Sequence, residues 1–439
     1  MPLSVRSRLL LGAVVTATWS PCRDSFASMH DKDIYKKFLE INSPWVITDV
    51  QLNDSKMTVS VAIEFRGEPC CPKCGKSCAG YDSRVRTWRH LDSCQYKTLL
   101  VASIPRVQCQ EHGVVQLETP WAQDSSRFTA LFECVVIEWL KEANFSAVAR
   151  RMKLSWDEVD GIMSRAVARG LSRREACSPT RIGVDETSFQ KRHEYVTVVT
   201  NIENSTVIAV MDGRTEQSLS NYLGSLDQAQ RTAIVVAAMD MWPAYINAVS
   251  RHLPNVKIAF DRFHIAKHLG DAVNAVRKDE HRELLAEGDA TLAKTKYVWL
   301  QKPNRMKRSR RMLLSQLIYS TLRTARAWAL KETASKLWHY ISEAWARRAW
   351  NEWISWAMSC KLEPMIRAAK MVQKHLDGII NAIVLKATNA LGESMNAKIQ
   401  KIKAQACGYR NRQRFRDAIM FHLGGLDMYP QKSLTHTKP

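Results

Sequence analysis

Six cysteines lie close together in the N-terminal third of the chain, at spacings typical of metal ligands: Cys70, Cys71, Cys74, Cys78, Cys94 and Cys109. Two residues separate Cys71 from Cys74, and two separate Cys109 from His112. Tetrahedral zinc takes cysteine and histidine ligands at such spacings. Strand-like sequence lies between the two pairs. This pattern predicts a zinc ribbon whose ligands are Cys71, Cys74, Cys109 and His112.

Other ligand sets remain open at this stage. Cys70 could take the place of Cys71, and Cys78 or Cys94 are weaker alternatives. The remaining interpretation is that these are free cysteines in a small β-domain. The clustering argues against a secreted disulfide protein, in which cysteines are spread along the chain.

Two aspartates further along the chain sit at positions suited to a second kind of metal site. Asp185 lies in "TRIGVDETSF", a predicted strand, and Asp240 ends "AIVVAAMD", another predicted strand. The elements from residue 179 to 270 follow the order β-β-β-α-β-α-β-α. This order is typical of an α/β RNase H-like fold, a mixed sheet flanked by helices. In that fold the two strands are neighbours, so we expect the two carboxylates to converge.

Glu393 stands at the head of a predicted helix that is followed by a basic stretch. An ion pair on the helix would need a base three or four residues away, but those positions hold Asn389, Ala390, Asn396 and Ala397. A capping box would need Ser or Thr at position 390. A helix-dipole contact is possible and modest. We therefore favour Glu393 as the third ligand of a magnesium site.

Such a site would suit the chemistry of DNA phosphodiesters. That chemistry needs an activated water or 3′-hydroxyl and a stabilised leaving oxygen, and two Mg²⁺ ions supply both. Mg²⁺ prefers carboxylate oxygens, water and phosphate as ligands. Mn²⁺ is the expected substitute.

Asp261 and His264, in "FDRFH", follow the fifth predicted strand and are possible auxiliary residues. His264 would protonate a leaving oxygen or hold a phosphate. An equally good interpretation is an Asp that caps the next helix beside a packed His. Glu186 adjoins Asp185, but strand alternation turns it to the other face of the sheet.

Length and charge set the context for these residues. The chain has 439 residues, enough for about three domains. Its formal net charge of +21 indicates a polyanionic partner, by default double-stranded DNA. No long uncharged span lies inside the chain, which argues against a membrane. We therefore expect a cytoplasmic protein that is bound to DNA.

The first 28 residues resemble a signal peptide, with Arg6 and Arg8 ahead of an apolar run. Export does not fit a basic, cysteine-clustered chain. We therefore interpret residues 1–28 as a start-site extension, with the natural beginning at Met29.

Residues 128–171 form three predicted helical pieces, and the last two are typical of a helix-turn-helix with Ser155 as the helix cap. Trp156 and Arg169 would lie on or near the recognition helix. An ordinary helical linker is nearly as good an interpretation. The predicted DNA contacts here are Arg150, Arg151, Lys153 and Arg165.

Residues 271–385 are helical and interrupt the α/β pattern, which indicates an all-helical insertion. They hold seven of the fourteen tryptophans, which we expect to be core residues. Residues 301–330 carry eight Lys or Arg and no acid, so either a solvated face or a phosphate contact is expected. The helix of Glu393 should begin at Thr388 or Asn389 and close at Gly408. The predicted DNA contacts in the basic stretch are Lys398, Lys401, Arg410 and Arg412.

Several stretches together resemble bacterial insertion-sequence transposases of the DDE class, close to the ISL3 family. They are "CPKCG", "IGVDETSFQKRHEYVTVVTNI", "MDMWPAYINAV", "FDRFHIAKHL" and "TNALGESMNAKIQKIKAQACGYRNRQRFRDAIMFHLGG". The resemblance covers most of the chain from about Met29. It implies that Asp185, Asp240 and Glu393 are the catalytic triad, and it supports the four zinc ligands. It also implies a homo-oligomer assembled on paired DNA ends.

The resemblance yields a set of expected domains and a function. The expected ranges are 29–120 (β-hairpin and zinc-ribbon DNA-binding domain), 121–178 (helix-turn-helix), 179–270 (RNase H-like core), 271–385 (helical insertion) and 386–439 (the C-terminal part of the core with the basic helix). The function would be binding to terminal inverted repeats, followed by strand cleavage and transfer. The alternatives are an inactive DNA-binding regulator and a host RNase H-like nuclease or resolvase.

Overall fold

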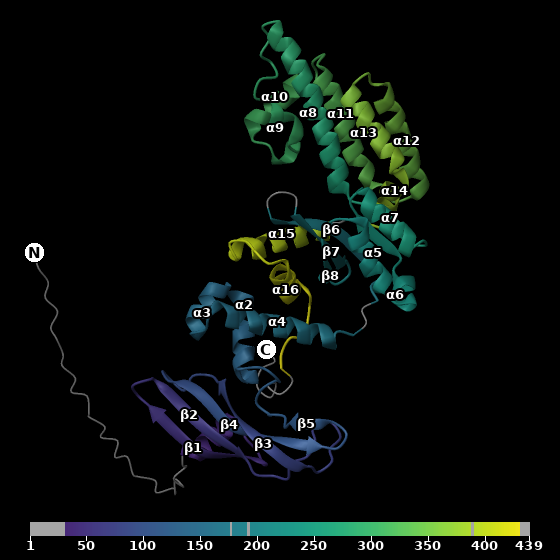
Figure 1. Ribbon diagram of the computed structural model, residues 1–439. Helices are drawn as coiled ribbons and strands as arrows, with labels where there is room; N and C mark the ends of the chain where they lie inside the picture. Colours follow the sequence, from purple (N-terminus) through teal and green to yellow (C-terminus); the bar gives the residue numbers. More distant parts are fainter. Residues whose placement is uncertain (1–30, 176–177, 191–193, 388–389, 431–439) are drawn as a thin grey trace, which may run out of the picture. The chain divides into compact units, whose positions relative to one another are not determined.

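The computed structural model describes residues 31–175, 178–190, 194–387 and 390–430, without the side chains of residues 303 and 390–393 (Figure 1). The predicted start-site extension, residues 1–28, lies outside the described residues. The chain divides into two units, one ending at Glu133 and the other spanning Cys134–Pro430. Within the described ranges, no helix is both long and apolar enough to span a membrane.

The first unit is built on a mixed sheet of antiparallel and parallel strands. A short helix, α1 (Asp31–Phe38), precedes β1 (Trp45–Asn53), β2 (Thr58–Phe65), β3 (Ala79–Arg89), β4 (Lys97–Cys109) and β5 (Gly113–Gln116). The strand order is β1-β2-β4-β3, with β5 on β4, and β1 and β2 form an antiparallel hairpin. Side chains of β4 alternate between buried and half-buried, as expected for a sheet with one core face. Trp45, Trp88 and Trp121 pack edge to face in that core.

Three helices follow: α2 (Ala130–Glu142), α3 (Phe145–Met152) and α4 (Trp156–Arg173). Asn144 caps α3 through a hydrogen bond from the backbone N–H of Ala147. Ser155 caps α4 in a reciprocal capping box with Glu158, as the sequence predicts. Lys153 adopts a left-handed conformation between the two helices, with φ of 52°. The helices and the short turn between α3 and α4 thus form where the local sequence places them.

A mixed five-stranded sheet forms the centre of the second unit. Its strands are β6 (Arg181–Gln190), β7 (Glu194–Asn201), β8 (Thr206–Asp212), β9 (Val236–Met239) and β10 (Lys257–Phe260), in the order β10-β9-β6-β7-β8. Strands β6, β7 and β8 are antiparallel, whereas β9 and β10 run parallel to β6. The predicted adjacency of the two aspartate-bearing strands is confirmed, because Val184 pairs with Met239. Helices α5 (Glu216–Ser225), α6 (Gln228–Ala233) and α7 (Pro243–His252) lie between strands of this sheet in the sequence.

Residues 262–384 are helical, as predicted. The helices are α8 (Arg262–Ala286), α9 (Lys296–Leu300), α10 (Arg308–Leu317), α11 (Arg323–Lys336), α12 (Glu343–Ser359), α13 (Glu363–Lys374) and α14 (Leu376–Val384), with short 3-10 turns at Pro303–Arg305 and Leu337–His339. Trp299, Trp350 and Trp353 are buried, as expected of core residues. For Trp345 and Trp356 the core prediction is wrong, since they are 61% and 45% exposed.

The basic stretch after residue 390 is two helices, α15 (Ala390–Gln405) and α16 (Arg412–Leu423). The predicted closure is confirmed, because Cys407 and Gly408 take left-handed conformations with φ of 54° and 95°. The predicted starting residues, Thr388 and Asn389, lie outside the described residues. Arg410 and Arg412 therefore do not belong to the helix of Glu393.

Helix α14 approaches β10 so closely that residue 378 has no room for a side chain. A Cβ on Gly378 would lie 2.3 Å from Cδ2 of Phe260, the last residue of β10. We expect Gly378→Ala to push α14 from the sheet and to cost about 1–3 kcal/mol of stability. Thermal unfolding measures this loss.

The matched control is Gly270→Ala in α8, where the new Cβ would meet Leu300 Cδ2 at an ordinary 3.8 Å. This control should unfold at or above the wild-type temperature, because Ala favours helix over Gly. Equal unfolding temperatures for Gly378→Ala and the wild type would contradict the close contact.

Candidate functional site

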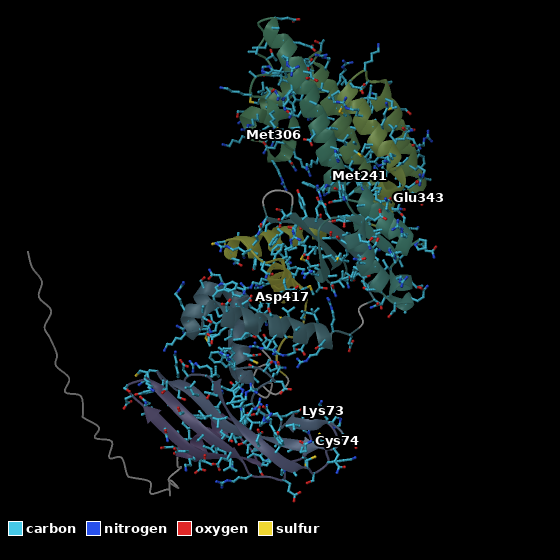
Figure 2. The ribbon with its side chains drawn as sticks, viewed as in Figure 1. Lys73, Cys74, Met241, Met306, Glu343 and Asp417 are labelled. Atoms are coloured by element: carbon cyan, nitrogen blue, oxygen red, sulfur yellow. The ribbon has the colours of Figure 1, made fainter. Side chains whose placement is uncertain are left out.

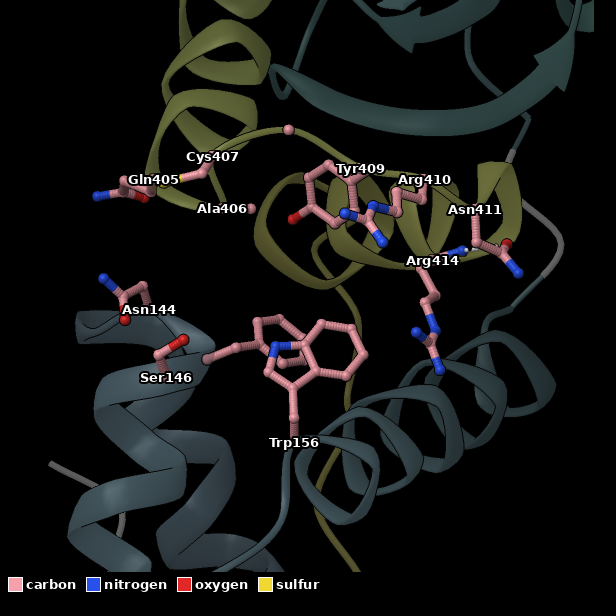
Figure 3. Close-up of a pocket in the computed structure, with 12 residues that line it drawn as sticks. Asn144, Ser146, Trp156, Gln405, Ala406, Cys407, Tyr409, Arg410, Asn411 and Arg414 are labelled. Carbon is pink, nitrogen blue, oxygen red and sulfur yellow. Dashed lines mark hydrogen bonds between the residues drawn. The ribbon is translucent and has the colours of Figure 1, made fainter.

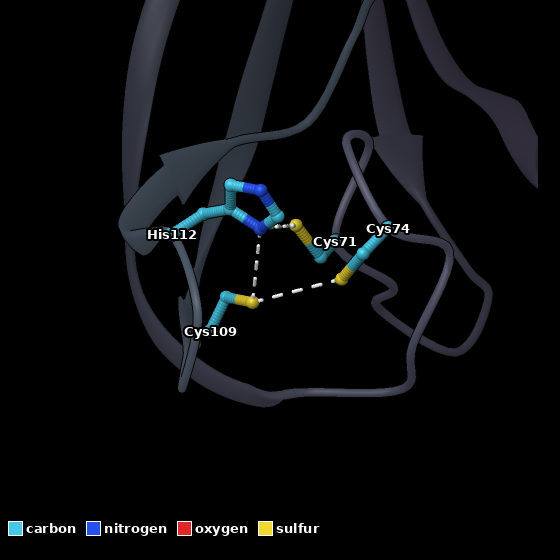
Figure 4. Close-up of side chains that lie close together, drawn as sticks. All are labelled: Cys71, Cys74, Cys109 and His112. Atoms are coloured by element: carbon cyan, nitrogen blue, oxygen red, sulfur yellow. Dashed lines mark hydrogen bonds between the residues drawn. The ribbon is translucent and has the colours of Figure 1, made fainter.

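The four predicted zinc ligands lie together at the end of the first sheet (Figure 4). The Sγ atoms of Cys74 and Cys109 are 3.7 Å apart, and Nδ1 of His112 lies 3.7 Å from Sγ of Cys71 and 3.6 Å from Sγ of Cys109. All four ligand atoms fall within 4.8 Å of one another. The tight β4–β5 turn brings Cys109 and His112 together, and a loop before β3 carries the other pair.

The separations match those of tetrahedral zinc. Zn–S bonds of about 2.3 Å and Zn–N bonds of about 2.0 Å at tetrahedral angles place ligand atoms about 3.6–3.8 Å apart. Hydrogen bonds from the backbone N–H groups of Glu111 and His112 lower the pKa of the Cys109 thiol to about 7. Thiolate is the form that binds metal. Three of the ligand separations therefore already match tetrahedral zinc, and all four ligand atoms lie close enough to converge on one ion.

None of the alternative cysteines belongs to the cluster of four, although Cys78 lies near Cys109. Cys70 forms an isolated β-bridge with Ser77, and its neighbour Cys71 is the one that is buried in the cluster. Cys94 is exposed. The only cluster of three or more candidate metal ligands found in the described part of the chain is the Cys/His group.

Asp185 and Asp240 lie at the same level of the central sheet. Asp185 follows Val184 on β6, and Asp240 follows Met239 at the end of β9, where Val184 and Met239 are paired. Asp185 Oδ1 accepts a 2.7 Å hydrogen bond from the N–H of Glu186, and Asp240 Oδ1 accepts one of 2.6 Å from the N–H of Met241. Each aspartate is thus oriented by the backbone immediately after it.

The Asp185 carboxyl is largely buried, and its titration reflects this. Burial is the main cause that raises its pKa to about 6, and the negative charges of Asp261 and Glu186 add to the effect. The hydrogen bond from the N–H of Glu186 and the nearby His264 act in the opposite direction. A carboxylate kept in such a place costs free energy that a bound cation would offset.

Asp261 and His264 also lie at this end of the sheet. Nδ1 of His264 is 3.2 Å from Oδ2 of Asp240. Asp261 caps α8, because its Oδ1 accepts a hydrogen bond from the N–H of Phe263. Its other oxygen, Oδ2, is buried and has no hydrogen-bond partner among the described residues. Asp261 therefore combines the helix cap with a buried oxygen that lacks a donor.

Helix α15 lies along β6 through three polar side chains that sequence reasoning missed. Nδ2 of Asn396 donates to Oδ2 of Asp185 at 2.6 Å, Nε2 of Gln400 donates to Oγ1 of Thr187 at 2.8 Å, and Nζ of Lys403 donates to the carbonyl of Ser188 at 2.8 Å. Their spacing of four and three residues is that of one helix face. Only this periodic polar face could have signalled them. The side chain of Glu393 is outside the described residues.

Glu186 turns away from this group, in agreement with strand alternation. Its carboxylate lies 3.3 Å from Nη1 of Arg214. The guanidinium of Arg214 in turn stacks between Tyr195 and Trp242, with its central carbon 4.3 Å and 5.0 Å from the two ring centres. Glu186 is therefore occupied by a local ion pair.

The predicted DNA contacts fall into two groups. Arg150, Arg151, Lys153, Lys398, Lys401 and Arg410 are exposed, whereas Arg165 is half-buried on α4. Arg412 is exposed and pairs with Glu194 at 3.2 Å. Arg169 is buried and donates to the carbonyl of Met428, so it lies on α4 but cannot reach DNA there.

The two later arginines of the basic stretch hold α16 to its neighbours. Arg414 pairs with Asp157 and Asp160 of α4 at 3.2 Å and 2.9 Å, and Arg416 pairs with Asp212 at 3.4 Å. Asp417, labelled in Figure 2, accepts a 3.0 Å hydrogen bond from the hydroxyl of Ser164. Part of the positive charge that the sequence assigns to substrate binding is thus used inside the protein.

A pocket of about 410 Å³ lies where the starts of α3 and α4 face the segment between α15 and α16 (Figure 3). Trp156 stacks on Phe145 with ring centres 5.1 Å apart, and the guanidinium of Arg414 lies 4.5 Å from the Trp156 ring. Tyr409 and Arg410 line the opposite side. This stack explains why Trp156, although 39% exposed, is held in place.

Family comparisons match three consecutive parts of the chain. A model of the ISL3 family described as "Transposase" matches residues 182–419, which is more than half of the 439 residues. The "Helix-turn-helix domain of transposase family ISL3" matches residues 117–167. The "zinc-finger of transposase IS204/IS1001/IS1096/IS1165" matches residues 67–112, the segment that holds the Cys/His cluster.

Curated relatives agree over most of the chain. The transposase for insertion sequence element IS1001 of Bordetella parapertussis is 25% identical over 350 residues, covering 79% of this chain and 86% of the relative. The transposase for insertion sequence element IS1557 of Mycobacterium tuberculosis is 24% identical over 430 residues, covering 90% of this chain and 96% of the relative.

Proposed function

Because the chain belongs to the ISL3 family of DNA transposases, we propose that it binds the terminal inverted repeats of its own insertion sequence and cleaves and transfers their strands with a metal-dependent DDE site. The proposed catalytic residues are Asp185, Asp240 and Glu393. The observation that carries this proposal is the contact of α15 with Asp185. Asn396 donates to Asp185, and position 393 precedes it by one turn of the same helix.

The geometry of α15 and β6 supports the third acid. The helix and the strand run in the same direction, because Asn396 contacts Asp185 and Lys403 contacts Ser188. Position 393 therefore lies about 4.5 Å before Asn396 along the helix axis, near the level of Val184 on β6. Val184 and Met239 are paired at that level, and Asp240 follows Met239. This register supports a common position for the three acids at one end of the sheet.

The donor types in this proposed site, carboxylate oxygens, are those that magnesium prefers. Asp185 and Asp240 provide carboxylates on adjacent strands, and the buried Oδ2 of Asp261 provides a further oxygen that lacks a donor. Bound Mg²⁺ would supply an activated oxygen nucleophile and stabilise the leaving oxygen. The protein's own part is to orient two of these carboxylates, Asp185 and Asp240, through the N–H groups of Glu186 and Met241.

His264 is the proposed auxiliary residue. Its contact with Asp240 fixes the ring beside the acids, with the other ring nitrogen available to a phosphate or a leaving oxygen. Asp261 positions this region by capping α8, the helix that carries His264. Both are placed by the short segment after β10.

The fold and domain assignments extend this proposal. The strand order β10-β9-β6-β7-β8, with three antiparallel strands first, supports an RNase H-like core over 179–270 that is completed by 386–439. Residues 271–385 would then be an insertion between the second and third acids. The zinc ribbon over 29–120 and the helix-turn-helix over 121–178 would recognise the ends. A homo-oligomer would bring two ends together.

The test of the proposed function is a cleavage assay on DNA that carries the gene's own flanks. We expect cuts at the repeat boundary with Mg²⁺ or Mn²⁺ and none without metal. Glu393→Gln should bind the same DNA but lower the cleavage rate by at least about three orders of magnitude, because it removes a metal-binding charge.

Matched controls separate this function from its rivals. Glu363→Gln in α13 removes an exposed carboxylate that is not one of the proposed acids, and this variant should cleave at the wild-type rate. Tight binding to the repeats without any cut would favour an inactive regulator. Cleavage that ignores the repeats would favour a host nuclease.

A further inference from the structure

A stretch of the helical region has a charge composition that neither the catalytic site nor the end-binding modules explain. Residues 290–331 contain eleven Lys or Arg and no Asp or Glu. The stretch runs through α9 and α10 and into α11. Such a composition over about forty residues is typical of a surface that meets a polyanion.

In one part of this stretch, around the start of α10, exposed cations have no acidic partner among the described residues. Lys302, Arg305, Lys307, Arg308 and Arg310 are exposed, and together they define the α10 surface. None of the five makes an ion pair with an acid within the described residues, and Arg310 has a single weak hydrogen bond, 3.4 Å long, to the side chain of Gln301.

Other arginines of the helical region are neutralised, which makes the contrast informative. Arg347 pairs with Asp377 at 2.7 Å, Arg348 pairs with Glu352 at 3.0 Å, and Arg367 pairs with Glu363 at 3.9 Å. Arg323, in the same acid-free stretch, reaches Glu280 and Glu283 of α8. Most surface arginines on these helices thus have an acidic partner, although Arg326 of α11 is exposed and has none within the described residues, and the α10 surface gathers several such cations in one place.

Helix α10 also packs against the rest of the protein through one face only. Leu314 and Leu317 are its buried residues, and Met306, labelled in Figure 2, anchors the preceding turn. The opposite side exposes Met312, and Tyr319 beyond the helix is 88% exposed. Lys307 precedes the helix without a side-chain hydrogen bond to its first turn, so the first N–H groups of α10 are open to an anion.

We propose that the α10 surface is a second DNA-binding surface, which contacts the phosphate backbone of duplex DNA without reading its sequence. Five long cationic side chains and a helix N-terminus supply phosphate contacts, and exposed Met312 and Tyr319 can pack on sugars or bases. In the view of Figure 1, α9 and α10 lie on the same side of α8 as α15 does.

This proposal depends on the proposed function only in saying where the bound DNA comes from. Two duplexes offer the same phosphate backbone: the host DNA that flanks the element's end, and the target DNA. The binding itself is measured without cleavage, so the two proposals can fail separately.

The experiment compares the full chain with the triple variant Lys307→Gln/Arg308→Gln/Arg310→Gln by fluorescence anisotropy at several salt concentrations. The probe is a duplex of unrelated sequence. Each phosphate contact contributes about 0.9 to the slope of log affinity against log salt. We expect the variant's slope to be smaller by about 2 to 3, so that wild-type affinity falls about 40-fold more between 50 and 200 mM salt.

The control is Lys361→Gln/Lys370→Gln/Lys374→Gln, which removes three exposed cations from the same helical region. It should keep the wild-type slope. An equal decrease of the salt slope in both variants, or an unchanged slope in the α10 variant, would overturn the proposal.

Two further measurements distinguish the sources of DNA. If the α10 variant binds an element end with flanking DNA more weakly than the wild type does, the surface contacts the flanking DNA. If the variant cleaves at the wild-type rate but transfers strands more slowly, the surface contacts the target DNA.

Discussion

Replacing Asp185 by asparagine is expected to abolish DNA cleavage and, at the same time, to raise the temperature of thermal unfolding at pH 7.5. Loss of cleavage, by at least about three orders of magnitude, follows from the proposed role of this carboxylate as a metal ligand. The gain in stability follows from its surroundings, since burial raises the pKa of Asp185 to about 6.

The sign of the stability effect comes from proton linkage. The folded state holds the Asp185 proton up to about pH 6, whereas the unfolded chain releases it near 3.8. Between these values the folded state binds more protons, so wild-type stability falls as pH rises through this window. Above pH 6 the whole cost of ionisation is present, up to about 3 kcal/mol for a shift of this size. The asparagine of the variant carries no such charge, and its amide can still meet Asn396.

The measurement is unfolding temperature against pH for both proteins, without divalent metal. The variant should be more stable at pH 7.5 and should lose its advantage near pH 4. Mg²⁺ should stabilise the wild type and not the variant, because only a protein with its ligand set intact gains from the cation.

Glu186→Gln is the matched control, since Glu186 is the next carboxylate on β6 and pairs with Arg214 instead of facing the acids. It should cleave DNA and gain no stability. An Asp185→Asn protein that unfolds at a lower temperature at pH 7.5 would show that the charge of Asp185 has a structural role.

The central sheet could be predicted from sequence because its signals are local. Each strand is a short apolar run that ends at a polar residue, and the order of elements then restricts which strands are neighbours. The pairing of Val184 with Met239 puts Asp185 and Asp240 together as the strand order predicts. Nothing in the local sequence, by contrast, links Asn396 to Asp185, which are 211 positions apart.

The distribution of positive charge could not be predicted for a related reason. A count of Lys and Arg does not show which cations have an acid nearby in space. Arg414 reaches back 257 positions to Asp157, so a residue of the basic stretch is used to fix α16 on α4. The α10 surface is also rich in Lys and Arg, and only the structure shows that its cations have no such partner among the residues it describes.

The Cys/His cluster was the most predictable group of side chains because each pair of its residues comes from one tight turn. Cys109 and His112 flank the β4–β5 turn, so their spacing alone places them together. The choice between the adjacent Cys70 and Cys71 needed the structure, because consecutive residues of an extended segment point in opposite directions. Burial of Cys71 decides it.

Cys109→Ser is expected to release zinc and to lower the affinity for the element's ends by about two orders of magnitude. Serine cannot replace a thiolate whose pKa is already lowered to about 7 by the N–H groups of Glu111 and His112. Structural zinc in small sites contributes on the order of 10 kcal/mol to local folding, so its loss should free the segment of Cys71 and Cys74 from the β4–β5 turn. Zinc content and end binding are the two measurements.

The rest of the first unit should survive this change, because its core is built from Trp45, Trp88 and Trp121, edge to face and independent of the metal. Far-UV circular dichroism should therefore remain near that of the wild type. Cys94→Ser, which changes an exposed cysteine outside the cluster, should keep both zinc and affinity. If Cys109→Ser lost zinc but still bound the ends with wild-type affinity, the ribbon would have no part in recognition, and the helix-turn-helix would have to account for it.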